Sequence, residues 1–255
     1  MKLSRTIRLA ITLAILSISV FVWILLLANP GNMAMQHCHV SASGPSAASL
    51  EMLLQMNPVS NQLFGWGLMV IAMMLPKLIV PIQQLYSQSL RRYRFISILL
   101  FVLGYIGIWM AAGVFMIVVI ITSNLLMPMS FIPPLVFFAI AVVWQFTPIK
   151  QRFLNRGHDH RVLSAFGWSA LRDAWKYGVS HGVWCVGAGW AMMLFPMLLP
   201  QGHNIAMLVV TFFMLSEHME NPRVPGWHFG ARLKLWRVVV GQVRVRKISW
   251  NNAQK

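Results

Sequence analysis

The chain has 255 residues, of which 58% are hydrophobic and only 10% are charged, and its formal charge is +16. A water-soluble domain usually has about 25% charged residues, so this composition excludes an ordinary soluble protein. The excess of Lys and Arg would suit nucleic-acid binding, but the basic residues follow the pattern of the hydrophobic segments. We therefore expect no nucleic-acid partner.

The basic residues mark one side of a membrane. Of the 21 Lys and Arg residues, 20 lie in four segments, which are 2–8, 91–94, 150–176 and 223–255, and Lys77 is the exception. The intervening loops contain no Lys or Arg, and they are 29–60, 123–130 and 200–203. Because basic segments stay in the cytoplasm, this alternation predicts an all-α, polytopic transmembrane bundle of six helices with both termini cytoplasmic. The basic segments would also contact anionic membrane lipid.

Six apolar runs supply the predicted helices, since a bilayer crossing requires about 20 residues. In chain order they cover residues 8–28, 62–86, 95–122, 131–148, 178–199 and 203–219. The first run is long for a signal peptide, so we expect it to be retained. The predicted divisions are a first transmembrane helix at 1–28, an outer loop at 29–60, a five-helix membrane domain at 61–220 and a basic cytoplasmic tail at 221–255.

The outer loop begins with a cluster of soft metal ligands. Thioether, imidazole and thiol groups fall within seven residues, and they are Met33, Met35, His37, Cys38 and His39. Side chains alternate between two sides of an extended segment, so the methionines and histidines would face one way. Sulfur ligands favour Cu(I), and zinc rarely takes thioethers. The loop is therefore a candidate copper site, and a loop of incidental polar residues is the alternative.

A second set of soft groups lies in the fifth predicted helix. His181 and Cys185 are four residues apart and therefore share one helix face. Met192 and Met193 follow Cys185 by seven and eight residues and continue that face. Polar groups at membrane depth are costly and usually functional. These four residues are candidate metal ligands, and ordinary packing of buried side chains is the alternative.

Two charged residues stand within or at the end of predicted helices. Glu217 lies at the inner end of the sixth helix with His218 and Glu220, and this group could receive or release a cation, or form an interfacial cap beside the basic tail. Lys77 follows Pro76 in the second helix. It could pair with a carboxylate such as Glu217, extend to the interface, or repel a cation and gate its passage.

Motifs of membrane enzymes are absent from the sequence. It contains no Walker loop, no Gly-x-Ser-x-Gly and no His-Glu-x-x-His. We therefore expect no catalytic residues and no enzyme activity, and a metal-dependent membrane oxidase is the least favoured alternative.

Four stretches of the membrane domain follow a shared pattern. The run from Tyr177 to Met193 approximates a Gly followed by His-Gly-x-x-Cys-x-Gly-Cys-Cys-Trp-x-Leu-Met. Residues 66–76 read Trp…Ala-Met-Met-x-Pro, 144–150 read aromatic-Gln-x-Thr-Pro-x-Lys, and 202–217 read Gly-x-Asn leading to Glu. Over about residues 60–220 the chain resembles the predicted metal-binding integral membrane proteins of bacteria, a family without an assigned function.

Two departures from the family pattern concern the candidate site. The adjacent cysteines of the family are Ala188 and Gly189 in this chain, and the Lys that follows the Glu is His218. If those cysteines bind metal in relatives, the membrane site is altered or lost here. His181, Cys185 and Glu217 are the matching positions that remain.

The resemblance implies a multi-pass protein of the bacterial inner membrane that handles a transition metal, and it makes the outer loop periplasmic. Combined with the ligand types, it leads us to expect copper. The loop would capture Cu(I), and the bundle would store it, move it inward, or pass it to a periplasmic or membrane cuproenzyme or copper chaperone. The alternative is a non-catalytic accessory or scaffold subunit of a larger membrane complex.

Overall fold

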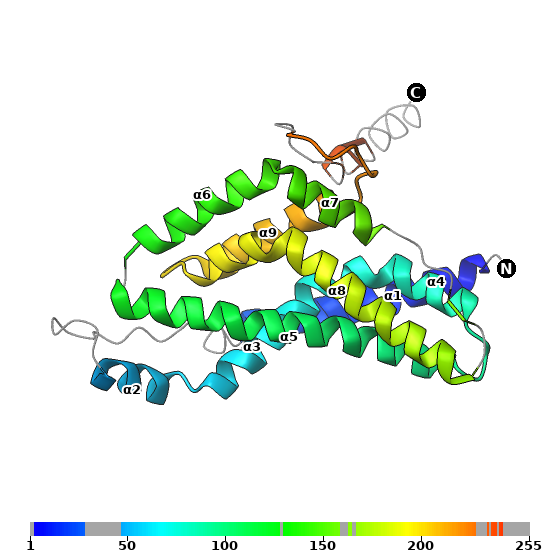
Figure 1. Ribbon diagram of the computed structural model, residues 1–255, viewed down its shortest axis with the longest axis horizontal. Helices are drawn as coiled ribbons and strands as arrows, with labels where there is room; N and C mark the ends of the chain where they lie inside the picture. The colour runs from blue at the N-terminus through cyan, green and yellow to red at the C-terminus, as the bar shows by residue number, and fades with distance from the viewer. Residues whose placement is uncertain are drawn as a thin grey trace, which may run out of the picture.

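The computed structural model of the chain is a bundle of α-helices (Figure 1). It describes residues 3–28, 47–127, 130–158, 163–164, 167–227, 234, 236–238 and 240–241, and these contain no β-strand. The helices are α1 (Arg5–Ala28), α2 (Ala47–Met56), α3 (Val59–Met74), the 3₁₀ segment η2 (Leu75–Leu78), α4 (Ile79–Gln88), α5 (Arg94–Leu126), α6 (Ile132–Phe146), α7 (Pro148–Gly157), α8 (Gly167–Met197) and α9 (His203–His218). The predicted all-α class is confirmed for this part of the chain.

Several of these helices are long and apolar enough to cross a membrane. Among the described residues there are four candidate spans, namely α1, the broken helix Val59–Gln88, α5 and α8, and the bent pair α6–α7 makes a fifth if it is one span. The predicted sixth span corresponds to α9, which has only 16 residues. A crossing requires about 20 residues, so α9 falls short of that length. The structure supports a membrane protein, while six crossings and cytoplasmic termini stay predictions.

Two prolines determine where the predicted helices change direction. Pro76 lies in η2, the 3₁₀ segment that joins α3 to α4. A proline inside an α-helix clashes with the preceding turn, and η2 takes the place of that turn. Pro148 begins α7, and the preceding Thr147 is extended, as a residue before proline prefers. The Thr147 side chain accepts a hydrogen bond from the backbone N–H of Lys150 at 3.2 Å and caps α7. As a result α6 and α7 bend by 69°.

The long helices α5 and α8 pack closely against each other at the centre of the bundle (Figure 1). A Cβ atom added to Gly178 of α8 would lie 2.1 Å from the backbone oxygen of Phe101 on α5. Small residues permit such close approach between helix backbones in membranes. Phe101 and Tyr105 of α5 are at most 1% exposed, so the interface of these two helices forms the core.

Three basic segments lie at the same end of the bundle. The N-terminus, the beginning of α5 after Arg91 and Arg92, and the beginning of α8 with Arg172 are together at one end (Figure 1). A single cytoplasmic face would require this arrangement, so it is compatible with the predicted orientation.

We expect Gly178→Ala to destabilise the protein by about 1–3 kcal/mol, because the new methyl group meets a backbone atom that cannot rotate away. Thermal unfolding of the detergent-solubilised full chain measures this loss. Gly107 of α5 is the matched control, since an added Cβ there meets nothing within 4 Å. Gly107→Ala should be neutral, or stabilising by up to about 1 kcal/mol. Equal unfolding temperatures for the two variants would contradict the close packing of α5 on α8.

Candidate metal site

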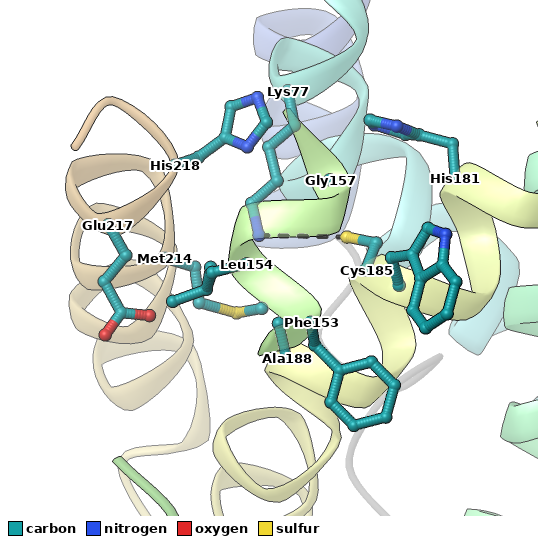
Figure 2. Close-up of a pocket in the computed structure, with 11 residues that line it drawn as sticks. Lys77, Phe153, Leu154, Gly157, His181, Cys185, Ala188, Met214, Glu217 and His218 are labelled. Atoms are coloured by element: carbon teal, nitrogen blue, oxygen red, sulfur yellow. Dashed lines mark hydrogen bonds between the residues drawn. The ribbon is translucent and has the colours of Figure 1, made fainter. Parts of the chain in front are cut away.

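A small cavity lies where η2, α7, α8 and α9 meet (Figure 2). Its walls are Lys77, Phe153, Leu154, Gly157, His181, Trp184, Cys185, Ala188, Met214, Glu217 and His218. Its volume is about 20 Å³, counted as the space open to the centre of a water molecule. That space holds a water molecule or a small ion, since one water needs about 10–15 Å³ by the same measure. An organic substrate does not fit.

Cys185 presents its thiol to this cavity from α8. The Tyr105 hydroxyl donates a hydrogen bond to Cys185 Sγ at 3.1 Å, and Lys77 Nζ lies 4.0 Å from the same sulfur. The Lys77 side chain extends from the break between α3 and α4 and points toward Cys185 (Figure 2). These two contacts hold the Cys185 sulfur at the cavity, next to a hydrogen-bond donor, the Tyr105 hydroxyl, and a cation, the Lys77 ammonium group.

His181 lies one helical turn before Cys185, and both line the cavity as their spacing predicted. The His181 ring is surrounded by aromatic rings. The ring centroids of Phe101, Tyr105 and Tyr177 lie 6.0, 5.8 and 6.0 Å from its own. This aromatic packing restricts where the imidazole can turn and keeps it beside Cys185.

His218 brings a second imidazole to the cavity from the end of α9. Its ring centroid lies 6.5 Å from that of His181, with the two rings edge to face. His158 of the α7 C-terminus stacks on His218 at 5.3 Å, and the two nitrogens of His158 face the backbone oxygens of Leu154 and His218 at 2.8 and 2.9 Å. His158 therefore holds the end of α9 against α7.

Met214, which was not among the predicted ligands, contributes a thioether to the same cavity. It lies four residues before His218 on α9, so the two residues share one helix face. A Cβ atom added to Gly189 of α8 would lie 2.2 Å from Met214 Cε. Because Gly189 has no side chain, the terminal methyl group of Met214 fits against it. The helical spacing of Met214 and His218 is the signal that could have identified both.

Glu217 also lines the cavity, but its carboxylate is engaged in a buried ion pair. Lys150 Nζ donates to both carboxylate oxygens of Glu217, at 3.1 and 2.8 Å, and also to Gln145 Oε1. The Lys150 and Glu217 side chains are 0% and 3% exposed. Lys77 was one predicted partner of Glu217, whereas the structure pairs Glu217 with Lys150. Metal binding by Glu217 stays a prediction.

The other predicted ligands lie elsewhere. Met193 is buried in the hydrophobic core, and Met192 packs against that core, so both are outside the walls of the cavity. The residues of the outer loop are outside the described part of the chain, and they are Met33, Met35, His37, Cys38 and His39.

Within the described part of the chain, no three His, Cys, Asp or Glu side chains come close enough to hold a metal ion. A tetrahedral zinc site of the usual composition is therefore not formed there. A metal ion in the cavity would require the Met214 thioether in addition to Cys185 and an imidazole. Thiolate and thioether ligands together favour Cu(I).

Comparison with known proteins gives one family. A family model described as PpoB2, copper chaperone, matches residues 63–240, a range that includes every residue lining the cavity. No curated protein and no solved structure matches the chain. The match confirms the expected relation to copper and points to the expected non-catalytic role. The more specific resemblance, to the predicted metal-binding integral membrane proteins of bacteria, stays a prediction.

We expect Lys150→Met to destabilise the protein by about 3–5 kcal/mol, because it leaves the buried Glu217 carboxylate unpaired. Adding Glu217→Gln to that variant should recover part of the loss, since no buried charge then remains without a partner. Thermal unfolding of the single and double variants measures both effects.

The pair of Arg223 and Glu220 is the control for this experiment, because water reaches it from the arginine side. The side chains are 42% and 9% exposed, so the pair is partly screened and losing Arg223 should cost less than losing Lys150. If Lys150→Met had no larger effect than Arg223→Met, the buried pair would not hold α7 and α9 together.

Proposed function

Because the chain belongs to the PpoB2 copper chaperone family, we propose that it carries Cu(I) in the cavity between α7, α8 and α9. The observation that supports this most directly is the set of side chains that line the cavity together. They are the Cys185 thiol, the Met214 thioether and the imidazoles of His181 and His218. Soft sulfur ligands select Cu(I), and the cavity volume suits one ion.

Cys185 is the central ligand in this proposal. A metal binds the thiolate, so loading releases the thiol proton. Met214 approaches from α9, opposite Cys185 on α8, and the two sulfur ligands come from different helices. One imidazole, that of His181 on α8 or of His218 on α9, supplies a nitrogen ligand. Because both helices contribute, loading would tie α8 to α9 at this point.

Lys77 makes the bound ion transferable. Its ammonium group is 4.0 Å from Cys185 Sγ, so it competes with Cu(I) for the negative sulfur and repels the ion. Lys77 is 7% exposed at the break between α3 and α4, where screening by water is weak. A cation on a flexible side chain lowers the affinity without blocking the site. A chaperone requires such a site, since it must release its cargo to a partner.

The last step of the proposed function is the delivery of Cu(I) to a partner protein. The protein lies in the bacterial inner membrane with both termini in the cytoplasm, and the outer loop containing Met33, His37 and Cys38 captures Cu(I) in the periplasm. The bundle then passes the ion to a periplasmic or membrane cuproenzyme or to another copper chaperone. Support comes from the candidate spans, the family and the ligand types.

We expect Cys185→Ser and Met214→Leu each to weaken Cu(I) binding by about tenfold or more, because each removes one sulfur ligand and preserves side-chain size. Competition between the detergent-purified chain and bicinchoninate under reducing conditions measures the affinity. Met116→Leu is the matched control, since Met116 is a buried methionine of α5 outside the cavity walls.

Unchanged Cu(I) affinity in Cys185→Ser would contradict the cavity as the copper site. The same assay tests the outer loop with the triple variant His37→Ala, Cys38→Ala and His39→Ala, which should bind less copper per chain. Equal copper would exclude those three residues. Absence of stoichiometric copper from the unaltered chain, with fixed partners that co-purify, would favour the accessory-subunit alternative.

We expect Lys77→Leu to slow the release of Cu(I) to bathocuproine by about tenfold or more, because it removes the charge without adding a sulfur ligand. Two charges 4 Å apart interact by about 4 kcal/mol at an effective dielectric constant of 20, and one third of that is a factor of ten. Lys77→Arg preserves the charge and should release Cu(I) at nearly the original rate. Release that is equally fast in Lys77→Leu would show that the ammonium has no part in transfer.

A further inference from the structure

His203 begins α9, at the opposite end of this helix from the cavity. Its ring is buried, with 9% of the residue exposed, and its Nδ1 lies 2.7 Å from the backbone oxygen of Pro196 on α8. A carbonyl oxygen only accepts hydrogen bonds, so Nδ1 carries the proton and donates it. The other ring nitrogen, Nε2, therefore has a free lone pair.

The Nε2 atom of His203 is buried and has no hydrogen-bond partner in the described part of the chain. Buried polar groups are nearly always paired, and an exception is explained by strain, by a catalytic role, or by a water molecule or ion that binds there. Histidines that bind metals typically donate their other ring N–H to a carbonyl, which fixes the tautomer and the ring orientation. His203 already has this arrangement.

The residues that follow His203 place soft ligands along one face of α9. Positions 203, 207, 214 and 218 fall within about 60° of one another around an α-helix with 3.6 residues per turn. This face, which we call the donor face, consists of His203, Met207, Met214 and His218. Met207 is 0% and Met214 is 4% exposed, so the donor face is turned into the bundle.

Helix α8 adds a sulfur between the two ends of the donor face. Gly189 of α8 adjoins Met214, and Pro196 of α8 adjoins His203, so α8 and α9 run antiparallel. Met193 lies between Gly189 and Pro196, and this register places it at the level of Met207. Met193 is 0% exposed. The two thioethers therefore lie in the middle of the path from His203 to the cavity.

We propose that His203 Nε2 and the Met207 thioether form a second Cu(I) site, from which the donor face conducts the ion to the cavity. The two ends of α9 are about 22 Å apart at 1.5 Å per residue, and the donors divide that distance into shorter steps. A site of neutral imidazole and thioether ligands binds Cu(I) less tightly than a thiolate does, which suits a transfer position. This inference rests on the proposed copper cargo and adds a path to it.

His203→Asn tests the second site without removing the contact that holds it. The asparagine amide donates in place of Nδ1 to the Pro196 oxygen, but it has no counterpart of Nε2. We would measure Cu(I) bound per chain, by competition with bicinchoninate, in full-length protein that already carries His37→Ala, Cys38→Ala, His39→Ala and Cys185→Ser. In that background we expect His203→Asn to lower the remaining Cu(I) affinity at least tenfold.

Two further variants provide a control and a second test of the site. Asn204→Ala alters the neighbouring position of α9 and should leave the affinity unchanged, while Met207→Leu should weaken it without disturbing the packing. Unchanged affinity in both His203→Asn and Met207→Leu overturns the second site and leaves the cavity proposal intact. If Cys185→Ser alone binds normally but His203→Asn does not, the cavity proposal fails and the His203 site stands.

Discussion

The buried ion pair between Lys150 and Glu217 holds α7 against α9 and so determines the shape of the cavity. An isolated charge at membrane depth is costly, and the desolvation penalty is offset only when a partner is close and well oriented. Lys150 on α7 reaches Glu217 on α9 because Thr147 and Pro148 turn the chain by 69° between α6 and α7. The same turn lays α7 across the end of α9 and forms one wall of the cavity.

Glycines determine how closely the other walls approach. Gly178 brings the backbone of α8 against α5, and that contact places Tyr105 within hydrogen-bonding distance of the Cys185 sulfur. Gly189 admits the end of Met214 from α9. In the family pattern that the sequence resembles, the position of Gly189 is a cysteine. In this chain a methionine from the neighbouring helix brings sulfur to the same part of the bundle.

Residue pairs on one helix could be predicted from the sequence more easily than contacts between two helices. Helical spacing was sufficient to pair His181 with Cys185. The spacing of Met214 and His218 places both on one face of α9, but it does not show that this face meets Cys185. That meeting depends on the register of α8 against α9, which contacts such as Gly189 with Met214 determine. For the same reason Glu217 was considered with Lys77, whereas the bend at Pro148 brings Lys150 to it. Hydrophobicity alone likewise predicted α9 as a span, although it has 16 residues.

We propose that sulfur and imidazole from α8 and α9 hold Cu(I) in the cavity that Cys185 lines. Copper K-edge X-ray absorption, on Cu(I)-loaded protein that carries His37→Ala, Cys38→Ala, His39→Ala and His203→Asn, examines those ligands without the outer loop and the second site. We expect a coordination shell that contains both sulfur and imidazole nitrogen. A shell of nitrogen and oxygen alone would contradict the cavity site, because it would place the ion away from Cys185 and Met214.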